Sequence, residues 1–147
     1  MSAKSEPAWV LDPPSAYDIV ACWYPERHKK DSPGPASRPG LVTQVLRGEQ
    51  TGRFACRVAF GTKKLKIVQR SHLDLIIQNS EHLDQLGLGM ATRFDLDLIA
   101  FLPWGVEFFD CWTGYRSPII GSLTEDYIRE YAFLMMRRES ASSGDEV

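Results

Sequence analysis

The chain passes from loop to strand within Pro33-Gly34-Pro35-Ala36-Ser37-Arg38-Pro39-Gly40-Leu41-Val42-Thr43-Gln44-Val45. Proline cannot continue a helix, and it pushes the residue before it toward an extended conformation. The stretch therefore predicts a stiff loop over 25–40 that presents Arg38 near its end, followed by an apolar strand over 41–47. Because a guanidinium is planar and always charged, an arginine at the mouth of a strand can face an anion. This placement suggests a partner that carries phosphate.

Short segments rich in β-branched and aromatic residues lie on both sides of this junction, and such segments are typical of strands. The predicted strands cover residues 17–24, 41–47, 53–60, 64–69 and 91–102, with 73–78 and 106–112 as further candidates. Residues 114–121 are predicted to form a loop. Many short strands with long connections predict a mainly β fold of the α+β class. We expect a strongly bent antiparallel sheet, or a partly open barrel, with helices packed on it.

Two helices are expected in the second half of the chain. Asn79 or Ser80 can cap a short helix over 81–86, which Gly87 ends. The sequence Ser122-x-x-Glu125 resembles a capping box and predicts a second helix through about Arg138. The apolar stripe of this second helix comprises Leu123, Tyr127, Tyr131 and Leu134.

The length of 147 residues is sufficient for one domain with a proper buried core. The pattern of segments predicts four parts along the chain. These are a flexible N-terminal arm over 1–15, a barrel domain over 16–112, a C-terminal extension with a helix over 113–139, and a disordered tail over 140–147.

The composition, 44% hydrophobic and 24% charged, is that of an ordinary soluble domain. No apolar run approaches the length of a membrane span, and the N-terminus lacks the apolar core of a secretion signal. We therefore expect a cytoplasmic protein without membrane contact. Cys22, Cys56 and Cys111 form no Cys-x-x-Cys pair, and we interpret them as reduced, mostly buried small hydrophobes. The sequence predicts neither a metal site nor a cofactor.

The net charge of −2 conceals a strong asymmetry along the chain. Residues 27–70 contain eleven Lys or Arg against two acids, a net charge of +9, whereas residues 71–147 contain five against thirteen, a net charge of −8. A cationic segment of this kind can attract nucleic acid in spite of an acidic isoelectric point. The alternative is that these charges meet acidic partners across the fold.

Four short motifs follow one another along residues 16–105: Tyr17-Asp18-Ile19-Val20, Arg38-Pro39-Gly40-Leu41-Val42, Val58-Ala59-Phe60-Gly61-Thr62 and Thr92-Arg93-Phe94-Asp95. In this order and spacing they resemble the PemK/MazF toxins of toxin–antitoxin systems. The similarity lies in a first strand, an Arg-Pro entry to the second, a strand that ends in Thr or Ser, and an Arg-x-Asp element. This chain continues for 35 residues beyond Trp112, and it carries there a helix that a minimal family member does not need.

The resemblance implies an SH3-like barrel that forms a homodimer. It implies an endoribonuclease that cleaves single-stranded RNA at short sequences, without a metal, by using the 2′-hydroxyl. It also implies a cognate antitoxin protein, whose flexible segment occupies the RNA groove. The alternative is a nonenzymatic barrel of the same kind that binds nucleic acid or a protein partner.

Metal-free cleavage of RNA needs a base for the 2′-hydroxyl proton, an acid for the 5′-oxygen and donors for the phosphate. Arg38 is the candidate phosphate ligand, and Thr62 is a candidate hydrogen-bond donor; the alternatives are a surface ion pair and a simple turn. Asp95 is the candidate base and Arg93 the candidate acid, because residues i and i+2 of a strand share one face. The alternative for this pair is a structural salt bridge. His28 is a further candidate acid or base, since histidine titrates near neutrality.

Aromatic platforms beside a cationic groove are the usual means of holding single-stranded nucleic acid. Tyr24, at the end of the first predicted strand, is the candidate for stacking on a base, whereas Trp23 is expected to be buried. The basic residues expected to contact RNA phosphates are Arg27, Lys29, Lys30, Lys63, Lys64 and Lys66.

Overall fold

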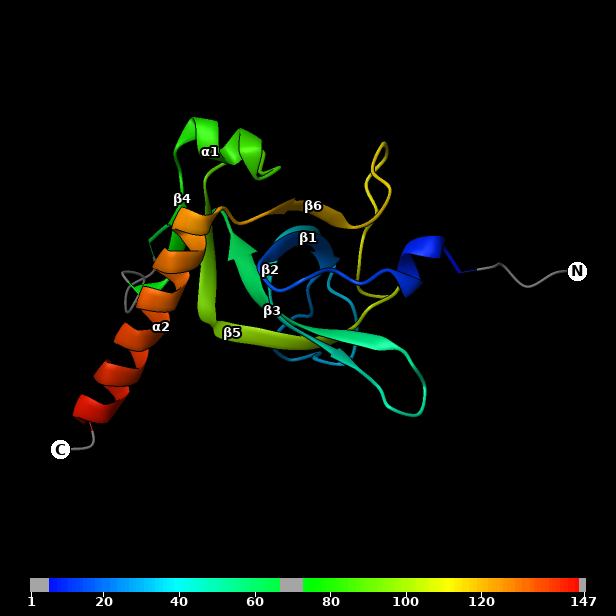
Figure 1. The fold of residues 1–147 in the computed structure, drawn as a ribbon, viewed down its shortest axis with the longest axis horizontal. Helices are drawn as coiled ribbons and strands as arrows, with labels where there is room; N and C mark the ends of the chain where they lie inside the picture. Colours follow the sequence, from blue (N-terminus) through cyan, green and yellow to red (C-terminus); the bar gives the residue numbers. More distant parts are fainter. Residues whose placement is uncertain (1–5, 67–72, 146–147) are drawn as a thin grey trace, which may run out of the picture.

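The computed structural model describes residues 6–66 and 73–145. Six strands of these residues form one antiparallel sheet in the order β4-β5-β3-β2-β1-β6, which curls strongly into a half-barrel (Figure 1). The strands are β1 (Asp18–Trp23), β2 (Ser37–Arg47), β3 (Phe54–Thr62), β4 (Leu75–Ile77), β5 (Thr92–Pro103) and β6 (Ile119–Ser122). Two α-helices accompany the sheet, and the second follows β6 at the C-terminal end. The predicted α+β class with a bent antiparallel sheet is confirmed.

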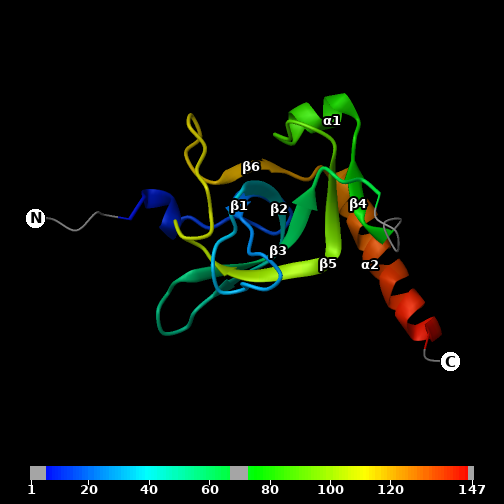
Figure 2. The same ribbon diagram turned by 180° about the vertical axis from the view of Figure 1, so that it is seen from behind.

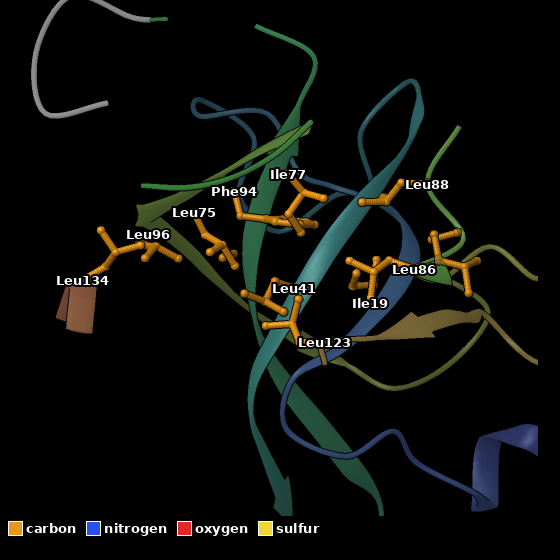
Figure 3. Packing of buried hydrophobic residues seen from close by; sticks show 13 residues of the cluster. Ile19, Leu41, Leu75, Ile77, Leu86, Leu88, Phe94, Leu96, Leu123 and Leu134 are labelled. Carbon is orange, nitrogen blue, oxygen red and sulfur yellow. The ribbon is translucent and has the colours of Figure 1, made fainter. Parts of the chain in front are cut away.

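The two faces of the sheet pack on separate hydrophobic clusters, because alternate residues of a strand point to opposite faces. Ile19 and Ala21 of β1 belong to one cluster, and Val20 and Cys22 belong to the other. All four side chains are fully buried, since β1 lies inside the sheet between β2 and β6. Figure 3 shows part of the first cluster, which also takes residues from outside the sheet: Leu86, Leu88, Leu123 and Leu134.

Helix α1 (Ser80–Gln85) begins where the sequence predicts it. Asn79 is the N-cap, and its side-chain oxygen accepts hydrogen bonds from the backbone N–H groups of Glu81 (3.0 Å) and His82 (3.4 Å). Of the two predicted caps, Asn79 is therefore confirmed. Gly87, at a φ of +72°, follows the helix in a conformation that glycine adopts without strain.

Helix α2 (Glu125–Asp145) runs past β4 and the adjoining part of β5 (Figure 2). It buries Leu134 in the first cluster, with Tyr127 and Tyr131 half-buried against it, as the predicted stripe requires. The backbone is helical through Asp145, so α2 continues beyond its predicted end near Arg138 into the segment 140–147 that was predicted as a tail, of which 146–147 lie outside the described residues. Neither helix of the described part combines the length and apolar composition that crossing a bilayer requires.

The start of β2 is earlier than predicted. The strand begins at Ser37 rather than at residue 41, because its first residues pair with the end of β1, Trp23 with Ser37 and Cys22 with Arg38. Arg38 therefore lies inside a strand and not at the end of a loop. A second difference is β6, which was predicted as a loop and forms because β1 has an edge free to pair with it.

Ser122 is the last residue of β6, and its hydroxyl donates to the carboxylate of Asp18 (2.5 Å) rather than capping α2. Residues 106–112 form no strand, and they contact β1 through a single bridge between Cys22 and Phe109. Residues 64–66 also lie outside any strand, and the remainder of that predicted strand, 67–69, lies outside the described residues.

Part of the predicted flexible arm is packed on the sheet. Residues Ala8–Leu11 form a short 3-10 helix, in which Trp9 and Val10 are buried in the second cluster. The indole N–H of Trp104 donates to the carbonyl of Trp9 (2.9 Å), and the two rings meet edge to face with centroids 5.0 Å apart. This contact closes one end of the second cluster.

Strand β5 bends sharply and gives the sheet its corner (Figure 1). Along β3, Ala59 pairs with Ile99 but the next residue, Phe60, pairs with Asp95, so residues 96–98 of β5 form a bulge. Side chains satisfy the backbone groups that the bulge leaves free. The N–H of Leu96 donates to Asp74 (3.1 Å), the N–H of Asp97 to Asp95 (3.0 Å), and the carbonyl of Leu98 accepts from Tyr24 (2.8 Å).

A buried ionic cluster lies beside this bend. The carboxylate of Asp74 accepts hydrogen bonds from the guanidinium of Arg93 (2.7 Å) and from that of Arg138 on α2 (3.2 Å). Arg93 also donates to the carbonyl of Lys64 (2.8 Å), and Arg138 also contacts Asp97. All three members of the core of this cluster, Asp74, Arg93 and Arg138, are buried. The cluster joins α2 to the bend of β5.

We expect Asp74→Ala to destabilise the protein by about 3–5 kcal/mol, because it leaves two buried guanidinium groups without their shared carboxylate. Urea unfolding measures this loss. Asp126→Ala is the matched control, since Asp126 forms an exposed pair with Arg129 and its loss costs at most about 0.5 kcal/mol. Should Asp74→Ala fail to fold, Asp74→Asn is the substitute, because asparagine retains the shape of the side chain. Its loss of stability is expected to lie between those of Asp74→Ala and Asp126→Ala. Equal stability of the Asp74 and Asp126 variants would contradict this account.

Candidate functional site

Six of the predicted site residues divide between two cavities. The Arg38 cavity, of about 290 Å³, is lined by Ser37, Arg38, Pro39, Gly61, Thr62, Lys63, Gly87, Leu88, Gly89, Met90, Thr92 and Trp112. The loop cavity, of about 580 Å³, is lined by Tyr24, Pro25, Glu26, Arg27, Lys30, Asp31, Asp97, Leu98, Ile99, Ala100 and Phe101. The structure therefore brings Arg38, Thr62 and Lys63 together, and it brings Tyr24, Arg27 and Lys30 together elsewhere.

The pairing of β2 with β3 explains why Arg38 and Thr62 line one cavity. The two strands run antiparallel with Gly40 opposite Phe60, so the start of β2 lies beside the end of β3. A side chain at Gly61 would meet the carbonyl oxygen of Pro39 at 2.3 Å, so only glycine permits this approach of the strands. The close approach at Gly61 is therefore to the neighbouring strand β2.

Local contacts hold the side chains of Arg38 and Thr62 in the Arg38 cavity. The guanidinium of Arg38 lies over the ring of Phe60, 5.6 Å from its centroid, which orients an otherwise exposed side chain. The hydroxyl oxygen of Thr62 accepts a hydrogen bond from the backbone N–H of Lys64 (3.2 Å). Because a hydroxyl can accept and donate at the same time, Thr62 retains its proton for an anion in the cavity.

The charges of the two cavities are opposite. Two cations, Arg38 and Lys63, line the Arg38 cavity, and none of its described lining residues is acidic. In the loop cavity, by contrast, the two cations are accompanied by three acids, Glu26, Asp31 and Asp97. A polyanion is attracted to the first and not to the second, since like charges repel. The predicted phosphate contacts of Arg27 and Lys30 therefore lie in an unfavourable setting.

Tyr24 is not an exposed stacking platform. Only 8% of its surface is accessible, its ring packs against Phe60 with centroids 5.0 Å apart, and its hydroxyl donates to Leu98. Burial raises the pKa of Tyr24, so the hydroxyl keeps the proton used in that bond. The expected burial of the two neighbouring aromatic residues is reversed, because Trp23 is half-buried and Tyr24 is buried.

Arg93 and Asp95 belong to the bend of β5. Arg93 is 2% exposed, and its guanidinium is occupied by Asp74 and the Lys64 carbonyl, so it cannot reach the leaving oxygen of a substrate as an acid. Asp95 accepts from the N–H of Asp97 and lies 3.5 Å from Arg93. The structural salt bridge, which the sequence left open, is the arrangement found.

The remaining predicted residues lie on the surface and line neither cavity. The side chain of His28 is 74% exposed, and its Nε2 lies 3.9 Å from the carboxylate of Glu26. Lys29 is exposed in the same loop, and Lys64 and Lys66 are exposed after β3. Among the predicted acid–base groups, His28 is thus the one open to solvent.

Sequence reasoning missed Trp112 as a residue of the site. It lines the Arg38 cavity, and its indole N–H donates to the hydroxyl of Ser37 (3.2 Å) at the start of β2. Trp112 lies far along the chain from Arg38 and Thr62, at the end of a segment predicted as a strand. The only signal available was an aromatic residue beside the Thr113-Gly114 turn.

A scan against models of known protein families finds no match for this chain, and a search of curated proteins finds none either. Within residues 6–66 and 73–145, no group of three or more His, Cys, Asp or Glu side chains is arranged to hold a metal ion. The polar groups of the Arg38 cavity are suited instead to binding an anion.

The cysteines are outside both cavities, and two of the three are buried. Burial raises the pKa of the Cys22 thiol to about 12 and that of Cys56 also to about 12, so both stay protonated at neutral pH. Because the thiolate is the reactive form, neither is expected to act as a nucleophile.

We expect a thiol reagent at pH 8 to modify Cys111 rapidly in the folded protein and to modify all three cysteines after denaturation. A colour-forming disulfide reagent with stopped-flow detection measures the number of fast thiols. Cys111→Ser is the control, and it should leave no fast thiol in the folded state. Rapid modification of Cys22 or Cys56 would contradict the burial argument.

Proposed function

We propose that this chain binds single-stranded RNA at the Arg38 cavity and cleaves it as a toxin-type endoribonuclease of the PemK/MazF kind. The observation that supports this proposal is the grouping of Arg38, Thr62 and Lys63 around one cavity, of which no described lining residue is acidic. The motifs that resemble the family are those that contribute Arg38 and Thr62 to this cavity. The curled antiparallel sheet is consistent with the SH3-like barrel that the resemblance implies.

In the proposed reaction the 2′-oxygen of a nucleotide attacks the adjacent phosphorus. The O2′–P bond forms and the P–O5′ bond breaks, while a base takes the 2′-hydroxyl proton and an acid protonates the 5′-oxygen. Negative charge builds on the non-bridging oxygens, where a guanidinium fork and a hydroxyl donor lower the barrier. Arg38 and Thr62 fill these two roles, and Lys63 adds positive charge. His28 is the remaining candidate for proton transfer, and because it lines neither cavity, this role requires the loop before β2 to bring it to the bound phosphate.

A second candidate function is a nonenzymatic barrel that binds RNA without cutting it. The observation that favours it is the structural use of Arg93 and Asp95 in the bend of β5, which leaves the described lining of the Arg38 cavity without an acid–base pair. Under either proposal we expect a homodimer. We also expect a cognate antitoxin with an acidic flexible segment, which would compete with RNA for the cations of the cavity.

We expect the purified protein to cleave single-stranded RNA in the presence of EDTA and to leave 2′,3′-cyclic phosphate ends. Arg38→Ala should slow cleavage by about 100-fold or more, because removal of one donor to a developing oxyanion typically costs this much. Arg57→Ala is the matched control, since Arg57 also lies over an aromatic ring, that of Phe101 at 5.7 Å, but lines neither cavity. Gel analysis of end-labelled RNA measures the rates.

The outcomes of this assay separate the two candidates. If the protein binds RNA without cleaving it, the nonenzymatic barrel is supported. If the protein neither binds nor cleaves RNA, both proposals are wrong. Equal rates for the Arg38 and Arg57 variants would remove Arg38 from the site.

The charge difference between the cavities gives a separate test by the salt dependence of RNA binding. We expect Arg38→Ala and Lys63→Ala each to reduce the slope of log K against log salt by about 0.7, the value for one contact with a single-strand phosphate. Arg27→Ala and Lys30→Ala should change the slope less, because acids of the loop cavity offset these cations. Fluorescence anisotropy with a labelled oligonucleotide measures the slopes. The reverse ranking would place the RNA at the loop cavity.

A further inference from the structure

The lining of the Arg38 cavity is divided into a charged part and an apolar part. The charged and polar part includes Arg38 and Ser37 at the start of β2, Thr62 at the end of β3 and Lys63 directly after it, with Thr92 from β5. Leu88, Met90 and Trp112 contribute apolar surface from two later segments of the chain. A nucleotide has the same division, because an anionic phosphate is joined through the sugar to an apolar, planar base.

We propose that Trp112 is the stacking platform for one base of the bound RNA, next to the phosphate held by Arg38 and Thr62. This inference rests on the proposed function, and it deepens it by assigning a base subsite. Trp112 lies outside residues 16–105, to which the resemblance is confined, so the family likeness does not supply this role. The half-buried ring lines a cavity that already carries the phosphate-binding groups.

The indole of Trp112 is held in position on two sides. Its N–H donates to the hydroxyl of Ser37 (3.2 Å), and its ring meets that of Tyr115 edge to face, with centroids 5.9 Å apart and planes at 86°. A side chain fixed before binding loses little entropy when a ligand stacks on it. Ser37 precedes Arg38 directly, so the bond to Ser37 also ties the ring to the residue that would grip the phosphate.

The size of the cavity agrees with a single nucleotide. Its volume of about 290 Å³ is just below the ~300–1,000 Å³ typical of pockets for drug-sized ligands. Every base presents a planar π-surface, so stacking on Trp112 would hold any base and leave sequence preference to other contacts. The proposed ligand is therefore one unpaired nucleotide of a single strand, with its base against the indole.

The first experiment measures binding without cleavage. A labelled single-stranded DNA oligonucleotide is the probe, because it has phosphates and bases but no 2′-hydroxyl to react. We expect Trp112→Leu to bind it about 5- to 140-fold more weakly, the effect of ~1–3 kcal/mol of base stacking at 1.4 kcal/mol per tenfold. Trp112→Phe should recover most of the affinity, since it retains an aromatic face. Trp23→Leu is the control, because Trp23 is also half-buried but lines neither cavity, and it should bind within about twofold of the unaltered protein.

The second experiment asks whether Trp112 contacts a base or only supports the cavity. One base of the oligonucleotide at a time is replaced by an abasic site, and each probe is measured with the unaltered protein and with Trp112→Leu. At the stacked position, the unaltered protein should lose about as much affinity as the substitution costs, and Trp112→Leu should lose nothing more. At other positions the two losses should add. Thermal unfolding of each variant confirms that it is folded.

The outcomes separate this inference from the function on which it rests. If the unaltered protein binds and cuts RNA but Trp112→Leu binds as tightly, the base subsite is wrong and the proposed function stands. The inference is also overturned if Trp112→Leu weakens binding by the same factor on every abasic oligonucleotide. Trp112 would then support the cavity without contacting a particular base. If the unaltered protein binds no single strand, both proposals fail.

Discussion

The bend of β5 is the feature on which the rest of the structure depends. Residues 96–98 of that strand have no pairing partner on β3, and the backbone N–H of the buried Leu96 would lack a hydrogen bond if the side chain of Asp74 did not reach it. The side chains of Asp74, Asp95 and Tyr24 hydrogen-bond to the backbone of these residues, and Arg93 and Arg138 hold the Asp74 carboxylate in place. The bend turns a flat six-stranded sheet into a half-barrel, and Arg138 brings α2 against it. A buried carboxylate shared by two guanidinium groups thus joins the corner of the sheet to the last helix.

The same bend determines where chemistry can take place. The bend uses the side chains of Tyr24, Arg93 and Asp95, which the sequence suggested for substrate contacts. Arg38, near the start of β2, and Thr62, at the end of β3, do not take part in it. Separation of charge then distinguishes the two cavities, because the loop cavity carries acids beside its cations and the Arg38 cavity carries cations without described acidic neighbours. Anion binding is favoured at one of them alone.

Local patterns predicted the elements well wherever a local cause acts. Segments rich in β-branched and aromatic residues predicted β1 and β3. Asn79 predicted the start of α1, because hydrogen bonds to a cap involve residues two and three positions away. The predicted strand boundaries were wrong where pairing with a distant strand decides whether a segment is extended. Ser37 to Gly40 contain proline and glycine, yet they form a strand because the end of β1 pairs with them. Ile119 to Ser122 form β6 for the same reason, beside a strand about a hundred residues earlier.

The sequence by itself determined the α+β class, the positions of most strands along the chain, the short first helix and the apolar stripe of the second, since each follows from backbone propensity or from side-chain period. It also singled out Arg38 and Thr62. Only the tertiary structure decided that Arg93 and Asp95 serve the bend of the sheet, that Tyr24 is buried, and that Trp112 joins the cavity of Arg38. The reason is that burial and hydrogen-bond partners depend on residues distant in sequence, and Asp74, Arg138 and Ser37 meet those residues only when the sheet has curled.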